Sequence, residues 1–295
     1  MSLQSLPRPI IGPRSQKLAL RIVSAIMGLL TTILGAVYGL SEYQLRRTYD
    51  VDLVALRADA RAGRAEEGKR LSHMFGCAGC HQNAGNMLFE APHVIRLVAP
   101  NLTRIVPEYT DAEFLRLIRT GVRRDGTGVM VMPSATFANM SDDDAASLLA
   151  YYRSVKPLPD AEPEGTQIHF IGRVVLALGK VPFAAKTAQP NLAPVHRPVA
   201  TPEDEGAYIV KTVCSHCHNL TESHDDGWGM VTPPLAMMGQ AYSNEDFHTL
   251  MRTGKAMGNR EVGLMSDVAR QDLSKMTDSE INAIHAYLNS VEMPE

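Results

Sequence analysis

The longest apolar stretch of the chain lies close to its N-terminus. Nineteen residues without a charge run from Ile22 to Leu40. As a helix they would extend about 28 Å, close to the ~30 Å hydrocarbon layer of a bilayer. A cleaved signal peptide is the alternative, but its apolar region is normally only about 7 to 15 residues long. The pattern therefore predicts a transmembrane anchor over residues 18–40, preceded by a tail (1–17) and followed by a linker (41–62).

The charges that flank this apolar run predict its orientation. Four basic residues and no acidic residue precede it: Arg8, Arg14, Lys17 and Arg21. After the run, Arg46 and Arg47 are offset by Glu42 and Asp50. Because an excess of basic residues marks the cytoplasmic side of a membrane helix, we expect a cytoplasmic tail, with the rest of the chain on the other side.

The remainder of the chain contains an internal duplication. The pentapeptide that begins at Cys77 recurs at Cys214, a shift of 137 residues. The tripeptide Arg-Thr-Gly at 119–121 recurs at 252–254, a shift of 133. Self-similarity over long blocks indicates repeated structural units. The sequence therefore predicts two homologous domains, one over residues 63–158 and one over residues 202–295.

Within both copies, apolar residues recur mainly at helical spacing and strand-like alternation is scarce. Middle helices are predicted over residues 111–119 and 244–252. The last helix of each copy follows a good N-cap, Ser141 or Thr277, with acidic residues in its first turn. The predicted fold class is all-α: a transmembrane helix followed by two tandem helical domains.

The two copies are separated by a connector over residues 159–201. It is rich in proline and is predicted to be mostly extended. Within it, the segment from His169 to Val181 is apolar enough to form one short helix. That segment is too short to cross a membrane, so we expect it to pack against one of the domains.

Composition excludes several classes of protein. Of the 295 residues, 45% are hydrophobic and 21% are charged, so the chain can build folded cores and is not a disordered polymer. The formal net charge is −3 and only 6% of the residues are aromatic. A nucleic-acid-binding protein would carry a large basic excess or aromatic platforms, so no nucleic-acid partner is expected.

All four cysteines fall in two pentapeptides of the form C-x-x-C-H. This is the attachment signature of c-type haem, in which two thiols bond to the porphyrin and the histidine ligates the iron. A zinc site and a pair of disulfides are alternatives, but neither explains a histidine directly after each second cysteine. The sequence predicts two covalently bound haem c groups held by the following residues: Cys77, Cys80 and His81; Cys214, Cys217 and His218.

Two methionines are candidates for the sixth iron ligand. Met132 lies eleven residues beyond Gly121, and Met265 lies eleven residues beyond Gly254. Met130, Met257 and Met276 are further candidates, but only Met132 and Met265 coincide between the repeats. Most methionines fill cores, and Met140 and Met276 are expected to do so. A thioether opposite a histidine raises the reduction potential and closes the iron to small molecules, which suits electron transfer.

Further residues are expected around these groups. A carbonyl at Pro100 or Pro233 could accept a hydrogen bond from the proximal histidine, although either proline could simply form a turn. Arg119 and Arg252 occupy equivalent helix ends, where they could pair with haem propionates or be solvated at the surface. Three aromatic side chains are expected to pack near a porphyrin or in the core: Tyr109, Trp228 and Tyr242.

Each half of the chain resembles a class I cytochrome c domain. The resemblance rests on the C-x-x-C-H motifs and on these segments: 99–103 (APNLT), 119–122 (RTGV), 132–134 (MPS), 141–144 (SDDD), 252–254 (RTG), 264–266 (LMS) and 281–288 (INAIHAYL). It implies that Tyr151 and Tyr287 cross the first helix of their domain near Gly68 and Gly206. The exported part is similar to membrane-anchored cytochrome c subunits of periplasmic alcohol, aldehyde or gluconate dehydrogenases, which often carry three haems.

The resemblance implies an electron-transfer protein without catalytic residues, anchored by a single span in a bacterial inner membrane with its haem domains in the periplasm. Its expected partners are a dehydrogenase or quinol-oxidising complex and a respiratory acceptor such as a terminal oxidase. A dihaem peroxidase is the enzymatic alternative, but it needs an iron that can lose its distal ligand. A thiolate-ligated enzyme would need a spare cysteine, and a haem sensor would need a signalling domain.

Charge is distributed unevenly between the two copies. Residues 201–295 contain fifteen acidic and six basic side chains, a net charge of −9, whereas residues 1–200 carry +6. We therefore expect a basic partner surface to dock on the second domain with salt-sensitive association, and the first domain to lie nearer the membrane. An acidic surface that merely provides solubility is the alternative.

Overall fold

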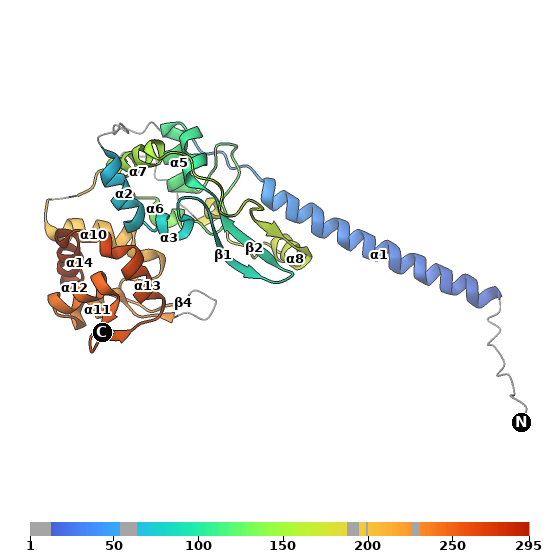
Figure 1. Cartoon of the computed structure of the whole chain (residues 1–295). Helices are drawn as coiled ribbons and strands as arrows, with labels where there is room; N and C mark the ends of the chain where they lie inside the picture. The colour runs from blue at the N-terminus through green and yellow to red at the C-terminus, as the bar shows by residue number, and fades with distance from the viewer. Residues whose placement is uncertain (1–12, 54–63, 188–194, 199, 226–230, 295) are drawn as a thin grey trace, which may run out of the picture.

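The computed structural model describes residues 13–53, 64–187, 195–198, 200–225 and 231–294. Its first element, α1 (Pro13–Arg46), projects as one long helix from a body that contains both domains (Figure 1). A candidate membrane span covers Gln16–Arg46, and its apolar side chains are not buried by other parts of the chain. The helix is longer at both ends than the predicted anchor. Residues 1–12 of the predicted tail lie outside the described residues.

The chain attaches to the first domain directly after α1. Thr48 forms an antiparallel bridge with Thr127, and the Tyr49 N–H donates to the Gly126 carbonyl oxygen at 2.9 Å. The first part of the predicted linker is therefore helix and docked backbone. Residues 54–63, which complete that linker, lie outside the described residues.

The first domain is built from short helices around one apolar core. In chain order these are α2 (Ala65–Met74), α3 (Cys77–His81), α4 (Leu102–Ile105), η2 (Val106–Glu108), α5 (Asp111–Thr120), α6 (Ser134–Phe137) and α7 (Asp142–Ser154). Helix α2 crosses α7 at Gly68, where an added Cβ would lie 1.8 Å from the Ser147 carbonyl oxygen and 2.8 Å from the Tyr151 Cβ. This close crossing is the one that the resemblance implied.

The second domain repeats this arrangement. Its helices are α10 (Pro202–Thr212), η3 (Cys214–His216), α11 (Leu235–Ala241), α12 (Asn244–Thr253), α13 (Leu264–Gln271), η4 (Leu273–Lys275) and α14 (Asp278–Ser290). Two small hairpins pair β4 (His224–Asp225) with β5 (Val231–Thr232) and β6 (Lys255–Ala256) with β7 (Arg260–Glu261). At the crossing of α10 and α14, a Cβ on Gly206 would lie 2.0 Å from the Ala283 carbonyl oxygen.

The helix starts predicted from the sequence are confirmed. The Ser141 side chain accepts from the Asp144 N–H at the start of α7, and the Thr277 side chain accepts from the Glu280 N–H at the start of α14. Each side chain satisfies a backbone donor that has no partner inside its helix. The middle helices α5 and α12 both end at a glycine in the left-handed conformation, Gly121 and Gly254.

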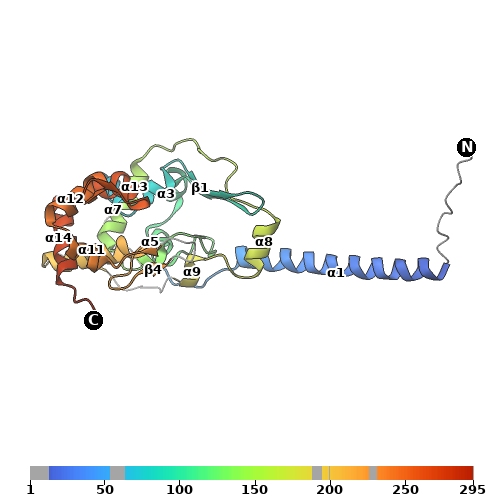
Figure 2. The same ribbon diagram turned by 90° about the horizontal axis from the view of Figure 1, so that it is seen from below.

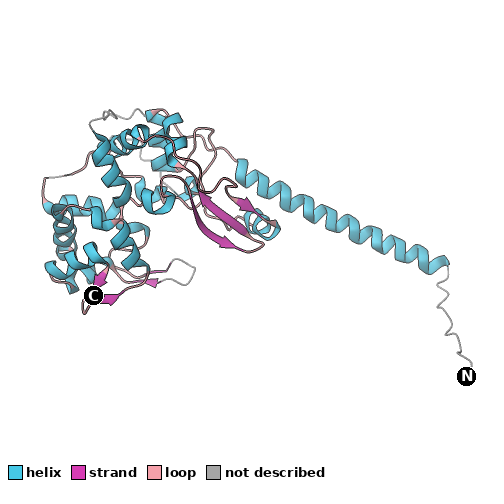
Figure 3. Ribbon diagram, in the orientation of Figure 1, coloured by secondary structure: helices cyan, strands magenta, loops and turns pink. Residues whose placement is uncertain are grey.

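Most of the described chain is helical, as predicted, but the fold is not strictly all-α, and its largest sheet lies in the first domain. After α3 the chain forms an antiparallel hairpin of β1 (Asn86–Ala91) and β2 (Ile95–Ala99), which is extended by β3 (Gln167–Ile168) from the connector (Figure 3). The hairpin turns at residues 92–94, between two short apolar runs. Short apolar runs do not distinguish strands from buried helix by periodicity alone, which is why the sequence argument missed this sheet.

The connector is folded rather than extended along much of its length. It contributes β3, α8 (Phe170–Ala177) and α9 (Ala184–Thr187), while residues 188–194 and 199 lie outside the described part. The helix expected within residues 169–181 is therefore confirmed. Helix α8 lies beside the end of α1, a position that Figure 2 shows from below.

The two domains meet through a buried polar network. Arg70 on α2 binds Glu280 on α14 through contacts of 2.6 and 3.0 Å, and Arg197 of the connector reaches the same carboxylate at 2.7 Å. Glu280 is only 3% exposed. A buried carboxylate is costly unless it is paired, and these two guanidinium groups provide the pairing. The network therefore fixes one domain against the other.

Candidate functional site

The two C-x-x-C-H segments each form a single helical turn. Residues 77–81 make up α3, and η3 (Cys214–His216) is continued by a hydrogen bond from the His218 N–H to the Cys214 carbonyl oxygen at 3.1 Å. Residues three apart lie on the same side of such a turn. Each pair of cysteines is therefore presented on one side, and the histidine follows at the end of the turn.

The first cysteine of each motif has a sulfur in a desolvated environment. No disulfide joins the four cysteines. Burial raises the pKa of both Cys77 and Cys214 to about 12. Such positions favour neutral sulfur, as in a thioether, over the thiolate that a zinc site requires. Among the described residues, no three His, Cys, Asp or Glu side chains converge on a point where a metal ion could bind.

The histidine of each motif is oriented by a proline carbonyl. The His81 Nδ1 lies 2.8 Å from the Pro100 carbonyl oxygen, and the His218 Nδ1 lies 3.2 Å from the Pro233 carbonyl oxygen. Burial lowers the pKa of both histidines, which favours the neutral ring. A neutral ring that donates from Nδ1 leaves Nε2 as its acceptor, and such a hydrogen bond commonly orients a metal-binding histidine.

Local hydrogen bonds hold each proline next to its motif. In the first domain, Asn101 follows Pro100 and caps α4 by accepting from the Thr103 N–H at 3.1 Å. In the second domain, the Thr232 hydroxyl donates to the Cys217 carbonyl oxygen at 2.5 Å, and the Leu235 N–H donates to the Asn219 carbonyl oxygen at 3.0 Å. The two copies reach the same histidine–carbonyl geometry through different bonds.

The two candidate methionines occupy equivalent positions in the domains. Met132 precedes α6 and Met265 lies in the first turn of α13, and both side chains are partly buried against the core. The residue before Met132, Val131, has a φ of 64°, which is strained for a β-branched side chain. Such strain persists only where the surroundings impose it and is concentrated at functional sites.

The connector supports the strained Met132 loop. Met130 pairs with Phe183 through an isolated bridge, and the Val131 N–H donates to the Pro182 carbonyl oxygen at 3.3 Å. Phe183 is only 2% exposed. The sequence argument missed this role of the connector, because nothing in a proline-rich stretch indicates which loop it will cover.

The Met265 loop is held by its own side chains. Ser266 stands where the first domain has Pro133, and its hydroxyl donates to the Gly254 carbonyl oxygen at 2.5 Å while accepting from the Val262 N–H at 2.8 Å. Ser266 is 1% exposed. These two hydrogen bonds of Ser266 hold the Met265 loop in place, although the loop has no proline at this position.

The two methionines expected to pack in the core do so. Met140 and Met276, which precede the last helices, are 0% and 2% exposed and belong to the apolar core. Met257, another candidate, is 37% exposed. Among these side chains, Met132 and Met265 retain the combination of equivalent position and partial burial that a ligand needs.

The surface position considered for Arg119 is wrong, and the structure shows what both arginines bind. Arg119 is 2% exposed, and its Nη2 donates to the Met140 carbonyl oxygen at 2.6 Å and to Asp142 Oδ1 at 2.7 Å. It is therefore not a solvated surface residue. Arg252 makes the equivalent contacts, donating to the Met276 carbonyl oxygen at 2.5 Å and to Asp278 Oδ1 at 2.6 Å. Both guanidinium groups bind the first turn of the last helix, a role that the repeat alignment did not reveal.

The remaining candidate side chains are distributed between core and interface. Tyr242 is 5% exposed within the core, and Tyr109 packs partly buried against it. Trp228 lies outside the described residues. His73 of α2 faces the second domain, with its Nδ1 3.5 Å from Asp272 Oδ1.

The second domain also contacts the attachment turn of the first. An added Cβ on Gly79, between Cys77 and Cys80, would lie 2.4 Å from Asp272 Oδ2. Burial raises the pKa of the Cys80 thiol, and the nearby Asp272 carboxylate and Cys217 thiol raise it further. The second domain therefore packs directly against the attachment turn of the first domain through Asp272.

These residues fit a covalently attached haem in each domain. The donor set is a pair of neutral sulfurs, an oriented imidazole and a partly buried thioether. Other partly buried apolar side chains pack against the same core as Cys77, Cys214 and the two methionines: Leu102, Ile105, Tyr109 and Tyr151 in the first domain; Val213, Leu220, Met238, Val262, Val268 and Tyr287 in the second. Such a lining suits a flat, apolar macrocycle with one polar metal centre.

Fold and site together define a class: a protein with two small helical domains, each built around a C-x-x-C-H turn. A comparison with protein-family models gives the cytochrome c family, described as "Cytochrome c", in two regions, residues 65–156 and 203–292. The chain belongs to the cytochrome c family. Members of this family carry covalently bound haem c, and the two matched regions correspond to the two repeats found in the sequence.

Similar proteins include cytochrome subunits of dehydrogenases. The fructose dehydrogenase cytochrome subunit of Gluconobacter japonicus is 27% identical over 79% of this chain and 54% of its own length. The cytochrome c subunit of a quinone alcohol dehydrogenase from Gluconacetobacter polyoxogenes is 25% identical over 81% and 58%. The gluconate 2-dehydrogenase cytochrome c subunit of Pantoea cypripedii is 26% identical over 80% and 62%.

The predicted resemblance to dehydrogenase cytochrome subunits is confirmed by these matches. The chain spans between 54% and 62% of the length of these three relatives. Each of these relatives is named as the cytochrome or cytochrome c subunit of a dehydrogenase.

Proposed function

We propose that this chain is a membrane-anchored dihaem cytochrome c that transfers single electrons on the periplasmic side of a bacterial inner membrane. Its donor would be a dehydrogenase or a quinol-oxidising complex, and its acceptor a respiratory protein such as a terminal oxidase. The observation that carries the proposal is the matched pair of a carbonyl-oriented histidine and a partly buried methionine in each repeat.

When bound, each haem supplies an iron that cycles between ferric and ferrous states by one electron. Cys77 and Cys80 would hold the first group by thioether bonds, and Cys214 and Cys217 the second. The Nδ1–H of each histidine stays on its proline carbonyl, so the ring presents Nε2 in a fixed direction. A methionine on the opposite side would exclude water and peroxide, and its weak donation would favour the ferrous state.

The domain interface supports transfer between the two groups. Arg70 and Glu280 hold α2 of the first domain on α14 of the second, and Asp272 lies against Gly79 of the first attachment turn. Two redox groups in a fixed arrangement exchange electrons without waiting for domain motion. The acidic second domain, with a net charge of −9, would receive a basic partner surface.

The membrane orientation of the proposal follows from the sequence charges around α1. The basic residues before the apolar run would hold the N-terminus in the cytoplasm, and α1 would carry both domains to the periplasmic face. The dehydrogenase relatives named above support a complex of this kind for the chain.

The experiment that tests the function begins with the full chain, purified in mild detergent with its haem content measured. We expect two covalent haems per chain, ferrous haems that do not bind carbon monoxide, and no turnover of hydrogen peroxide. Native membranes should also yield a dehydrogenase that co-purifies and whose substrate reduces both haems. Rapid carbon monoxide binding at one haem together with peroxide turnover would instead establish the dihaem peroxidase alternative.

A further inference from the structure

Helix α8 of the connector lies level with the outer end of the apolar run in α1. The Arg173 guanidinium carbon lies 4.8 Å from the centre of the Tyr38 ring. The same side chain donates to Ser41 Oγ at 3.0 Å and to Glu42 Oε1 at 2.8 Å. The uncharged run ends at Leu40, so these contacts place α8 beside its last turn (Figures 1 and 2).

The residues of α1 at this level are typical of a membrane boundary. Tyr38 and Tyr43 lie on either side of the end of the run, and their side chains are 43% and 59% exposed. Tyrosine is enriched where a span meets the headgroup layer, because its ring is apolar and its hydroxyl is polar. If α1 crosses a bilayer, the surface of that bilayer lies at the height of α8.

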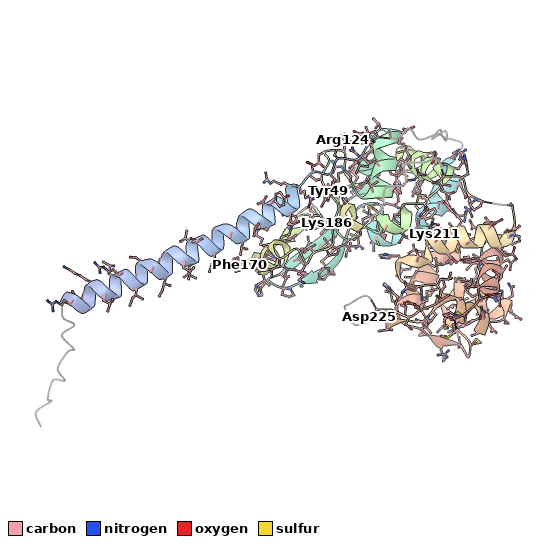
Figure 4. The ribbon with its side chains drawn as sticks, turned by 180° about the vertical axis from the view of Figure 1, so that it is seen from behind. Tyr49, Arg124, Phe170, Lys186, Lys211 and Asp225 are labelled. Carbon is pink, nitrogen blue, oxygen red and sulfur yellow. The ribbon has the colours of Figure 1, made fainter. Side chains whose placement is uncertain are left out.

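One side of α8 is packed and the other is an exposed apolar surface. Leu176 is 1% exposed, and a Cβ on Gly172 would lie 2.2 Å from the Val94 carbonyl oxygen, so this side sits tightly on the hairpin. In contrast, Phe170, Ile171 and Leu178 are 50%, 50% and 68% exposed. Figure 4 shows Phe170 at the edge of the first domain next to α1.

The charges around α8 complement an anionic lipid surface. From Gln167 to Thr187 the chain contains three basic residues and no acidic residue. Arg173 is paired with Glu42 of α1, which leaves the positive charges of Lys180 and Lys186 for an anionic surface. Basic residues beside an exposed apolar helix are the composition of helices that lie in the plane of a membrane surface.

We propose that α8 is an in-plane membrane contact, with Phe170, Ile171 and Leu178 inserted at the acyl–headgroup boundary of the outer leaflet beside α1. This inference rests on the proposed membrane span of α1. The occupant of the exposed surface is the bilayer, because the surface is continuous with the lipid-facing end of the anchor. The first domain is then attached to the membrane at two places and does not swing on a single tether.

The test uses the full-length holoprotein in nanodiscs of phosphatidylethanolamine and phosphatidylglycerol, with the photoreactive residue benzoylphenylalanine at one position. The test positions are Phe170 and Leu178. Leu30, in the middle of α1, reports on the span itself, and Val231 is the matched control in the second domain, with an exposure of 64%. Each variant is first checked for two haems by its absorption spectrum.

We expect lipid adducts at Phe170 and Leu178 in at least tenfold higher yield than at Val231, approaching the yield at Leu30. Labelling at Leu30 with only background labelling at Phe170 and Leu178 would overturn the membrane contact and leave the anchor intact. Background labelling at all positions would overturn the anchor. Adducts at Phe170 to a protein in native membranes, in place of lipid, would show that the surface docks a protein and would also overturn the inference.

Discussion

The Tyr208 hydroxyl of the second domain donates to Asp144 Oδ2 of the first domain at 2.6 Å, and the same hydroxyl accepts from the Ser141 N–H at 2.9 Å. Tyr208 and Asp144 are 6% and 5% exposed. One hydroxyl therefore satisfies both a buried carboxylate and the backbone at the start of α7.

Removal of this hydroxyl should weaken the domain interface. Tyr208→Phe leaves the Asp144 carboxylate without its hydroxyl donor, at a cost of about 1–3 kcal/mol. We expect a lower urea midpoint, with both haem spectra unchanged in the native state. Tyr43→Phe is the control, because that side chain is 59% exposed and its midpoint should not move. Equal midpoints for all three proteins would contradict the role of Tyr208.

The two equivalent arginines should differ in their contribution to stability. Arg119 and Asp142 are both nearly buried, so Arg119→Ala leaves a buried charge and should cost about 3–5 kcal/mol. The side chains of Arg252 and Asp278 are 31% and 77% exposed, so Arg252→Ala should cost only about 1 kcal/mol. Thermal unfolding of the two variants measures the difference.

Redox titration of the same variants separates a structural role from a haem contact. If the arginines bind only the first turn of the last helix, the haem potentials of correctly folded Arg252→Ala should equal those of the parent protein. A large shift of one potential in that variant would show that the guanidinium group also interacts with a propionate.

Substitution of Met132 tests the sixth ligand in the first domain. In Met132→Ala, one of the two irons should lose its sulfur ligand, so half of the weak ferric band near the red edge of the visible spectrum should disappear and one potential should fall. Met140→Leu is the matched control, since Met140 is fully buried in the core and the swap costs less than about 1.5 kcal/mol. An unchanged band in Met132→Ala would exclude Met132 as the ligand.

The crossing of α2 and α7 should not tolerate a side chain at Gly68. The Cβ of Gly68→Ala would overlap the Ser147 carbonyl oxygen at 1.8 Å, so the helices must separate, at a cost of about 3 kcal/mol or more. The better helix propensity of alanine offsets less than about 1 kcal/mol of this cost. We expect low holoprotein yield and a reduced melting temperature. Gly35→Ala in α1, where a Cβ meets no atom within 4 Å, should behave like the parent.

Acid should weaken the domain interface through Glu280. Although burial alone would raise it, Arg70 and Arg197 hold the pKa of Glu280 below its ordinary value of 4.5. A depressed carboxyl pKa contributes stability that is present above pH about 4.5 and is lost as the pH falls through the folded-state pKa. Burial raises the pKa of Asp144, so protonation of Asp144 favours the folded state as the pH falls. This effect offsets part of the stability that is lost at Glu280. Urea midpoints between pH 7 and pH 3 measure the net effect.

The Glu280→Gln variant isolates this carboxylate. Its urea midpoint should be lower than that of the parent at pH 7. Below pH 4.5 its midpoint should fall much less than the midpoint of the parent does. A decline as steep as that of the parent would assign the acid sensitivity to other carboxylates.

Local patterns predicted the parts of the site that depend on residues close in sequence. The turns at Cys77 and Cys214 follow from their motif, and the helix starts at Ser141 and Thr277 follow from capping. The resemblance to class I cytochrome c domains added Gly68 and Gly206, where two helices touch in each copy. These features need only a short segment or a comparison of the two copies.

Contacts between segments that are distant in the sequence could not be predicted from local patterns. Arg70 and Glu280 are 210 residues apart and lie in different copies, so no repeat relates them. Arg119 occupies a position that suits a surface residue, and only the packed fold shows that it is buried. The sequence argument missed the hairpin of β1 and β2 for another reason. Its apolar runs are too short for their periodicity to distinguish a strand from a helix.

The bridge between Thr48 and Thr127 comes within two residues of the end of α1. The helix and the first domain therefore share a connection too short to act as a swivel. A rotation of α1 about its own axis would therefore rotate the first domain with it. If α1 spans a membrane as proposed, the contacts of α1 with neighbouring helices would set the direction in which the first domain faces. Inserting a few flexible residues between Arg47 and Thr48 would uncouple the two.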